Sequence, residues 1–364
     1  MEKVRLGDIC SKQSSRLAQK DLENMDGSYP IFGASGLIKK INTYDQKSEY
    51  VAVVKDGAGV GRTMLLPAYS SVIGTLQYLI PNDNVNAKYL YYAVKSRHLE
   101  KYYTGSAIPH IYFKDYKSEP IILADGIAQR KIALVLERVE KIIEEHKQQL
   151  EMLDTLIKAR FVEMFGEPSI NPMGWKETTV GEECYYIKDG PHKSLPDVGI
   201  GKGYPFISVR NIINGSIDFS TAKYISEKDY FESIKKCHPQ KGDILYSKGG
   251  TTGIAKLVDV DIDFANWVHV AVLKFDDSLN GVFFENMLNC DYCYDQSQQL
   301  TKGIANRDLV LSAMAQIKMY KPPLELQKNF AAFVAQVDKS KSAIQKSLEK
   351  TQTLFDSLMQ EYFG

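Results

Sequence analysis

The chain has 364 residues, of which 44% are hydrophobic and 25% charged, and this composition excludes a disordered or collagen-like chain. Basic and acidic residues balance at 45 each, which excludes the strongly basic composition of a stand-alone nucleic-acid binder. The length predicts about two globular domains.

Apolar runs and cysteines together predict a cytoplasmic protein. No apolar run approaches the roughly 18–20 residues needed to cross a bilayer. The first ten residues, MEKVRLGDIC, lack the apolar core of a signal peptide. Five cysteines, an odd number in a long chain, favour reduced thiols.

Residues 1–118 are predicted to form a first globular domain of mixed helices and strands, with 16 basic and 11 acidic residues and therefore a net charge of +5. The segment Tyr50–Leu66 reads as a β-branched strand, a glycine turn and a second strand. Basic residues beside such turns are candidate DNA contacts, because Lys and Arg bind phosphate and Arg also reads base edges. In this domain the candidates are Lys39, Lys40, Lys55 and Arg62.

Residues 119–166 are predicted to form a central long helix. Its apolar residues alternate in spacings of four and three, which is the heptad period of a coiled-coil seam. About 39 residues at 1.5 Å each would make a rod of about 58 Å. The predicted seam residues are Ile132, Leu136, Val139, Ile143, Leu150, Leu153 and Ile157.

After a turn-rich linker at residues 167–173, residues 174–318 are predicted to form a second domain of mixed helices and strands, and residues 319–364 a C-terminal long helix. The candidate DNA contacts of this second domain are His192, Lys193, Arg210, Asn211, Lys248 and Lys256. The seam of the second long helix is predicted at Phe330, Val334, Val337, Ile344, Leu348, Phe355 and Leu358.

The chain contains an internal duplication. Residues Gln129–Gly166 align with Gln327–Gly364 at a constant offset of 198, without a gap, and 11 of the 38 aligned positions are identical. The globular segments correspond more loosely, for example where Gly105-Ser-Ala-Ile and Gly303-Ile-Ala-Asn precede the two helices. An internal repeat of this kind indicates that the fold is built from two similar units.

The duplication predicts two antiparallel long helices in a coiled coil, with a globular domain at each end and an approximate two-fold axis. DNA is itself pseudo-two-fold, so such a protein suits two short half-sites at a fixed separation. A rod of about 58 Å spans about 17 base pairs. The two domains differ in sequence, so the half-sites are expected to differ.

No motif in the sequence predicts catalysis or a metal. The nearest string to the Asn-Pro-Pro-aromatic turn of amino-methyltransferases is Asn171-Pro-Met-Gly-Trp175, which lacks the second proline. Cys290-Asp-Tyr-Cys293 is a single CxxC without the second pair that a zinc ribbon requires. We therefore predict no catalytic residues and no metal ligands.

The order of the segments and the doubled helix resemble the specificity subunit of type I restriction–modification systems over the whole chain. Pro120…Gln129-Arg-Lys-Ile-Ala and Pro322-Pro-Leu-Glu-Leu-Gln-Lys-Asn-Phe-Ala resemble the element that opens each repeated helix in that family. Within the two domains, the strings YPIFGASGLIKKI, KDGAGVGR, PFISVRNIINGSIDF and KGDILYSKGGTTG resemble family sequence. One departure is Ala124-Asp125-Gly126, where the second copy has Pro-Leu-Glu-Leu.

The resemblance implies a non-catalytic subunit that reads a bipartite, asymmetric double-stranded DNA target, with one recognition domain on each half-site. It implies that the helices set the gap and dock two methylation subunits, which use S-adenosylmethionine. It also implies restriction subunits that use ATP and magnesium in the full complex. The alternatives are a solitary or fused adenine methyltransferase of the type IIG kind and a coiled-coil scaffold that does not bind DNA.

Overall fold

The computed structural model describes residues 2–105, 109–213, 215–304 and 306–364. Residues 106–108, 214 and 305, which belong to strings compared above, lie outside these ranges. The chain divides into two compact units, and each unit contains one globular segment and part of both long helices. Unit 1 comprises Met1–Gln149 and Ile344–Gly364, and unit 2 comprises Leu150–Ala343.

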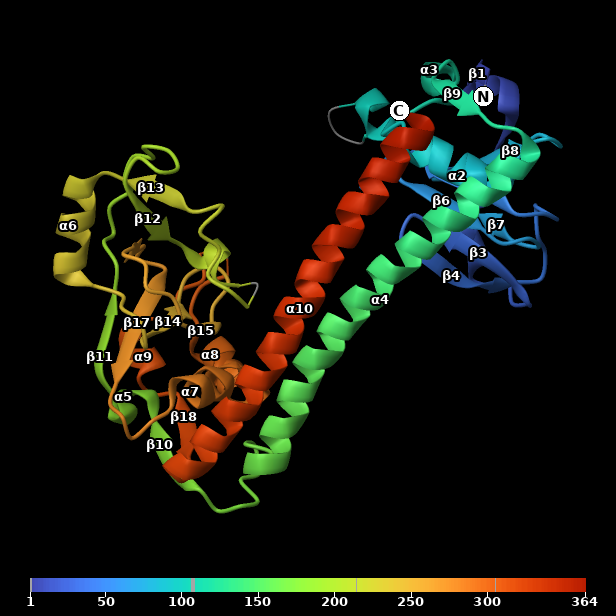
Figure 1. Cartoon of the computed structure of the whole chain (residues 1–364). Coiled ribbons are helices and arrows are strands. Elements are labelled where there is room, and N and C mark those ends of the chain that lie inside the picture. The colour runs from blue at the N-terminus through green and yellow to red at the C-terminus, as the bar shows by residue number, and fades with distance from the viewer. Residues whose placement is uncertain (1, 106–108, 214, 305) are drawn as a thin grey trace. The chain divides into compact units, whose positions relative to one another are not determined.

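Unit 1 contains two small sheets and a pair of terminal strands (Figure 1). The larger sheet has the order β2-β8-β5-β6 and is antiparallel, and the smaller has the order β4-β3-β7, with β3 and β7 parallel. β1 and β9 pair antiparallel. The strands are β1 (Glu2–Arg5), β2 (Cys10–Ser14), β3 (Tyr29–Gly33), β4 (Gly36–Ile41), β5 (Tyr50–Val54), β6 (Thr63–Leu66), β7 (Ser71–Val72), β8 (Leu76–Pro81) and β9 (Pro120–Leu123). The short helices are α1 (Leu6–Ile9), α2 (Ala87–Lys95) and α3 (Phe113–Tyr116), with 3-10 turns at Gln19–Leu22 and Leu99–Tyr102.

Unit 2 repeats this topology strand for strand. Its larger sheet has the order β11-β17-β14-β15, its smaller sheet the order β13-β12-β16 with β12 and β16 parallel, and β10 pairs with β18. The strands are β10 (Lys176–Thr179), β11 (Cys184–Asp189), β12 (Tyr204–Ile207), β13 (Lys223–Ile225), β14 (Ile244–Ser247), β15 (Ala255–Leu257), β16 (Ala265–Asn266), β17 (Val270–Phe275) and β18 (Lys318–Lys321). The short helices are α5 (Val180–Glu183), α6 (Glu227–Lys236), α7 (Gly281–Asn289), α8 (Asp291–Leu300) and α9 (Leu311–Met314), with a 3-10 turn at Val209–Asn211.

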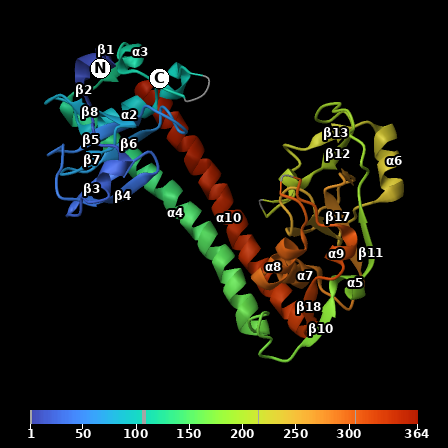
Figure 2. The same cartoon turned by 180° about the vertical axis from the view of Figure 1, so that it is seen from behind.

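Unit 2 differs from unit 1 by added structure on its smaller sheet. Helix α6 packs its Tyr230 and Ile234 against Phe206 and Ala265 of this sheet, and Figure 2 shows α6 beside β12 and β13. The described residues between β4 and β5 of unit 1 form no helix. β12 and β13 are joined by residues 208–222, whereas β3 and β4 are joined by residues 34–35 alone.

The two long helices are α4 (Gly126–Phe165) and α10 (Leu324–Phe363). Both begin later than residues 119 and 319, where helices are predicted, because β9 and β18 occupy the first residues of each segment and pair with β1 and β10. Helix α4 starts where the Asp125 carboxylate accepts the backbone N–H groups of Ile127 and Ala128, each at 3.0 Å. These bonds lower the pKa of Asp125.

The seam of the helices is buried within each unit. In unit 1 the beginning of α4, with Leu136 and Val139, shares a core with Phe355 near the end of α10. In unit 2 the end of α4, with Phe161, shares a core with Phe330 near the beginning of α10. The helices are therefore antiparallel in each unit. All fourteen predicted seam residues are buried or half-buried.

A buried glutamine ties each long helix to the globular segment in front of it. The Oε1 atom of Gln129 accepts the backbone N–H of Asn86 at 2.8 Å, and its Nε2 donates to the Ala124 carbonyl at 2.8 Å. Gln327 makes the same bonds to Asn280 and to the Pro322 carbonyl, each at 2.8 Å. Asn86 and Asn280 cap α2 and α7, so the same contact positions a helix in each unit.

Candidate nucleic-acid interface

In each unit a glycine-rich loop after a central strand is held against a second segment that precedes the long helix. We call residues 55–62 and 248–253 the glycine loops. The described residues 104–105 with 109–110, and 302–304 with 306–308, are called the facing loops. In unit 1 the Gly57 N–H donates to the Pro109 carbonyl at 2.9 Å. In unit 2 the Gly250 N–H donates to the Arg307 carbonyl at 3.1 Å. The paired loops are therefore part of the repeated fold.

Two positions in the glycine loops require glycine. Gly61 has a φ of +87°, and a Cβ there would lie 2.4 Å from the Glu100 backbone nitrogen. A Cβ on Gly249 would lie 1.9 Å from Nδ1 of His269. The glycines let the backbone pass close to a neighbouring segment, and the side chains around them remain free to differ between the units.

The polar pairs that join the loops place the acid on opposite sides in the two units. In unit 1 the acid is Asp56 on the glycine loop, and it contacts Nδ1 of His110 on the facing loop. In unit 2 the base is Lys248 on the glycine loop, and its Nζ lies 2.9 Å from the Asp308 carboxylate on the facing loop. Lys248 also lies 3.5 Å from Asp189, and its side chain is only 6% exposed.

The four candidates of unit 1 lie in different surroundings. Lys40 on β4 and Arg62 at the end of the glycine loop are exposed, and Arg62 donates from Nη1 to the Ala34 carbonyl at 3.0 Å. Lys39 pairs with Asp26 at 2.7 Å, and Lys55 lies 3.4 Å from Asp56. Lys40 and Arg62 are therefore the two candidates of this unit that are most available to a ligand.

In unit 2 three of the six candidates form bonds within the fold. Asn211 is buried, accepts from the Ser208 N–H at 3.0 Å and donates to the Asp218 carbonyl at 3.1 Å, so its amide holds the turn. Lys248 is buried between two carboxylates, as described above. Lys256 pairs with Glu285 at 3.0 Å, and both side chains are largely covered. The sequence analysis could not detect these internal bonds, because a sequence does not show which polar side chains pair with one another in the fold.

The remaining candidates of unit 2 include two exposed residues, His192 and Lys193. The segment that follows them reaches a cavity of about 230 Å³, which Arg210 also lines. The other lining residues are Ser194, Leu195, Phe206, Ser208, Lys223 and Trp267. The structure thus brings Arg210 together with a cation and an aromatic ring, Lys223 and Trp267, which the sequence analysis did not select.

Unit 1 also has aromatic and basic residues near its loops that the sequence analysis did not select. The ring of Tyr112, half of which is exposed, packs edge-to-face on His110 with 4.1 Å between centroids. The ammonium group of Lys114 lies 5.1 Å from the centre of the same ring. His110, Tyr112 and Lys114 follow the Gly105 string closely in the sequence, and this proximity could have identified them as candidates.

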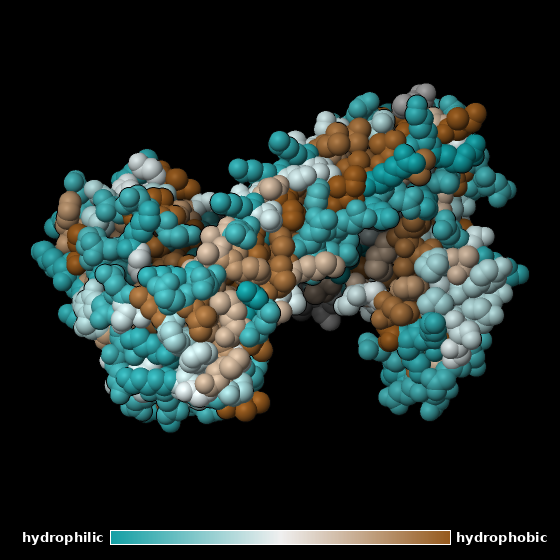
Figure 3. All heavy atoms as spheres, turned by 60° about the horizontal axis from the view of Figure 1, so that its bottom comes forward, coloured by the Kyte–Doolittle hydropathy of each residue, from teal (hydrophilic) through white to brown (hydrophobic). Residues whose placement is uncertain are grey.

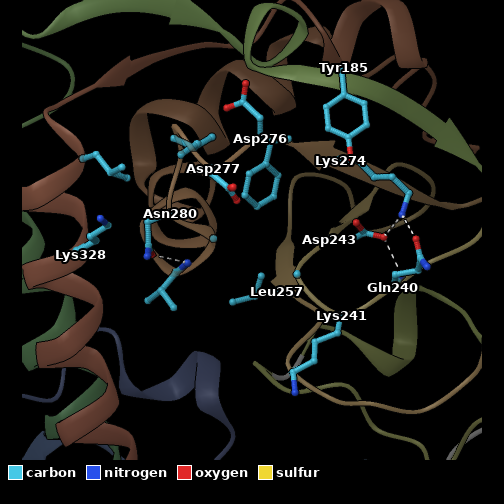
Figure 4. A pocket seen from close by; sticks show the side chains of 16 residues that line it. Tyr185, Gln240, Lys241, Asp243, Leu257, Lys274, Asp276, Asp277, Asn280 and Lys328 are labelled. Atoms are coloured by element: carbon cyan, nitrogen blue, oxygen red, sulfur yellow. Dashed lines mark hydrogen bonds and ion pairs between the residues drawn. The ribbon is translucent and has the colours of Figure 1, made fainter.

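A larger cavity of unit 2, about 920 Å³, has a balanced charge (Figure 4). Lys241, Lys274 and Lys328 line it together with Asp243, Asp276 and Asp277. Nζ of Lys274 lies 2.5 Å from the Asp243 carboxylate and 3.1 Å from the Gln240 amide oxygen. Burial raises the pKa of Asp243, and the bond to Lys274 opposes this. A lining with equal numbers of acids and bases does not favour a polyanion.

The described part of the chain contains no cluster of three or more His, Cys, Asp and Glu residues arranged to hold a metal ion. Among the helices of the described ranges, none combines the length and apolar character needed to cross a membrane.

Large apolar side chains are exposed along α4 in both units. Figure 3 shows apolar residues among polar ones on the face that it presents. The exposed apolar residues of α4 are Ile127, Leu134 and Ile142 in unit 1 and Met152, Leu156 and Val162 in unit 2. These six side chains are apolar surface that a protein partner could cover.

The sequence matches the family described as "Type I restriction modification DNA specificity domain" over residues 1–154 and 172–352. It is 23% identical over 393 aligned residues to the type I restriction enzyme MjaVIII specificity subunit of Methanocaldococcus jannaschii, covering 97% of this chain and 91% of that protein. It is 25% identical over 215 residues to the MjaIX specificity subunit of the same organism, covering 54% of this chain and 49% of that protein.

Two solved structures share the fold. The type I restriction–modification S subunit from M. genitalium superposes with a TM-score of 0.64 at 18% identity, covering 100% of this chain and 96% of the other. A chain from a structure titled for the complex assembly and conformational transition of the type I R-M system gives a TM-score of 0.52 at 15% identity, covering 99% and 97%.

These matches confirm the predicted α+β fold class, with two recognition domains and two long antiparallel helices. They also confirm the predicted role in DNA sequence recognition, in which catalysis lies on other subunits, and the predicted assembly with such subunits. Because the family model matches residues 1–154 and 172–352, which are most of the chain, the chain belongs to the type I restriction modification DNA specificity family.

Proposed function

We propose that the chain reads a bipartite, asymmetric DNA target, with unit 1 on one half-site and unit 2 on the other. The observation that carries this proposal is the repeated pair of loops: the backbone contacts are the same in both units, whereas the side chains around them differ. A repeated fold with different contacting side chains favours two different half-sites.

The long helices set the gap between the half-sites in this proposal. Each has 40 residues, or about 60 Å at 1.5 Å per residue. Inserting one heptad at the same level of both helices is expected to lengthen the gap without altering either half-site. An unchanged gap would contradict this part of the proposal.

The proposed partners are two methylation subunits, one for each half-site, and restriction subunits in the full complex. The exposed apolar side chains of α4 in both units support docking of protein partners along the helices. S-adenosylmethionine, ATP and magnesium would be bound by these partners. The proposed location is the cytoplasm, which suits the five unpaired cysteines.

The test is to combine the chain with its methylation subunits and to map the methylated adenines on a randomised DNA library. We expect one specificity chain with two methylation subunits, and one methylated adenine in each of two dissimilar half-sites. Methylation without sequence preference, or a target with a single continuous site, would contradict the proposal.

A further inference from the structure

The cavity beside Arg210 in unit 2 is lined by two cations, Arg210 and Lys223, and one carboxylate lies near both. That carboxylate, Asp197, accepts the backbone N–H groups of Gly199 and Tyr224, which lower its pKa, and the charges of Lys223 and Arg210 lower it further. Two cations against one carboxylate leave a net positive charge at the cavity.

Nη2 of Arg210 donates to the Thr221 carbonyl at 3.2 Å, and Nζ of Lys223 donates to the Leu195 carbonyl. Neither residue forms an ion pair in the described part of the chain, whereas Lys248, Lys256 and Lys274 each do. The cavity therefore carries a positive charge that would favour an anionic ligand.

The aromatic wall of the same cavity has a hydrogen-bond donor without an acceptor. Nε1 of Trp267 is covered, and no described residue accepts its N–H. Its ring packs edge-to-face on His269 with 4.7 Å between centroids, and Nδ1 of His269 is likewise covered and without a partner in the described ranges. Nδ1 of His269 lies against Gly249, so only the indole N–H of Trp267 belongs to the cavity wall. Because buried polar groups are nearly always paired, this free donor favours a ligand that accepts a hydrogen bond from it.

The matching segment of unit 1, which contains Ile73 and Thr75, has neither the tryptophan nor the histidine. The backbone N–H of Trp267 donates to the Ile207 carbonyl, as the backbone N–H of Ile73 donates to that of Phe32. The His269 carbonyl accepts from Lys248, as the Thr75 carbonyl accepts from Lys55. Trp267 and His269 thus stand where unit 1 has Ile73 and Thr75, on an otherwise equivalent backbone. The difference concerns contact side chains and leaves the fold unchanged.

We propose that this cavity binds one nucleotide of the half-site read by unit 2, with its phosphate held by Arg210 and Lys223 and its base or sugar packed on Trp267. The Trp267 N–H then donates to an acceptor of that nucleotide. A volume of about 230 Å³ lies below the roughly 300–1,000 Å³ of drug-sized pockets, so the cavity takes part of one nucleotide and leaves the rest outside. The inference rests on the proposed function, since it identifies residues that contact one half-site.

The test uses the full chain assembled with its methylation subunits and duplex DNA containing the mapped target. In Arg210→Gln and Lys223→Gln, an amide donor remains for the neighbouring carbonyl and only the charge is lost. Each change is expected to weaken binding about ten-fold. Each is also expected to reduce the slope of log affinity against log salt by about one. Lys241→Gln, which removes a charge from the balanced cavity, is the matched control and is expected to leave affinity and slope unchanged.

Trp267→Phe keeps an aromatic side chain, although a smaller one, and removes the indole N–H. We expect preference at one position of the unit 2 half-site to fall about five-fold, with the unit 1 half-site unchanged. Melting curves that match the unaltered chain show that these variants fold. Unchanged affinity, slope and preference in folded variants would overturn the inference. A separate experiment exchanges residues 174–318 for those of another specificity subunit. If one half-site changes, the proposed function holds even where the inference fails. If neither half-site changes, the proposed function itself is wrong.

Discussion

Units 1 and 2 have the same topology but differ at the contact between the long helices and the globular segment. In unit 2 this contact contains four phenylalanines, with Phe161, Phe165 and Phe283 around Phe330. At the equivalent positions unit 1 has Met359, Phe363, Tyr89 and Ile132, all in one core. The fold thus tolerates exchange of apolar side chains at this contact, provided that the seam stays apolar.

The units differ more at their loops. Unit 1 has an exposed arginine and an Asp–His pair at its glycine loop. Unit 2 has there a Lys–Asp pair whose lysine is buried and, beside it, a cavity formed partly by the longer β12–β13 connection. Equivalent backbone contacts with different side chains allow one fold to recognise two different sequences.

The largest expected effect concerns the aromatic contact. Phe330→Ala should lower the free energy of unfolding of unit 2 by about 4 kcal/mol, because it empties a completely buried site among rings. Ile132→Ala should cost unit 1 about 3 kcal/mol, since a smaller side chain is removed. Native-state hydrogen exchange, read separately in each unit, measures both values. A larger loss for Ile132→Ala would contradict the assigned difference in packing.

A smaller effect is expected from the equivalent lysines of the two glycine loops, Lys248 and Lys55. Lys248→Met leaves the half-exposed Asp308 without its cation, whereas Asp189 keeps Lys236 at 2.7 Å, and the change should destabilise unit 2 by about 2 kcal/mol. Lys55→Met removes a partly exposed charge and should cost unit 1 less than about 1 kcal/mol. Urea unfolding followed in each unit tests this contrast. Equal losses would show that Lys248 is no more important to its unit than Lys55 is.

The smallest effect concerns the turn that only unit 2 contains. Hydrogen bonds from Ser220 and Thr221 lower the pKa of Asp218 from its ordinary 3.8 to about 2. The turn should therefore keep this contribution above about pH 4 and lose it as the pH falls towards 2. Carboxyl titration by NMR is expected to show a midpoint near 2, and Asp218→Asn should abolish the transition. A midpoint near 4 would mean that these bonds do not form.

The repeat and the seam could be predicted from the sequence because a period of 3.5 residues and an offset of 198 are properties of the sequence itself. The starts of the long helices could not, since β9 and β18 are fixed by pairing with strands more than 100 residues away. The surroundings of single polar residues could not be predicted either. Asn211 and Lys248 look like surface residues in the sequence, and only the fold shows that both form internal bonds.

Trp267 and Lys223 were missed for a related reason. Trp267 lies in the apolar run Trp267–Leu273, where the sequence indicates a buried strand, and Lys223 precedes no glycine turn. Only the parallel pairing of β12 with β16 and the 208–222 connection bring them to one cavity with Arg210.

The claim that each unit reads its own half-site is tested most directly by giving the chain two copies of one reader. Residues 174–318 are replaced by a second copy of residues 1–118, because β10 and β18 match β1 and β9 at the junctions. Methylated adenines are then mapped in the assembled complex. We expect a symmetric target with two copies of the unit 1 half-site, and a target that keeps the original unit 2 half-site would contradict the account.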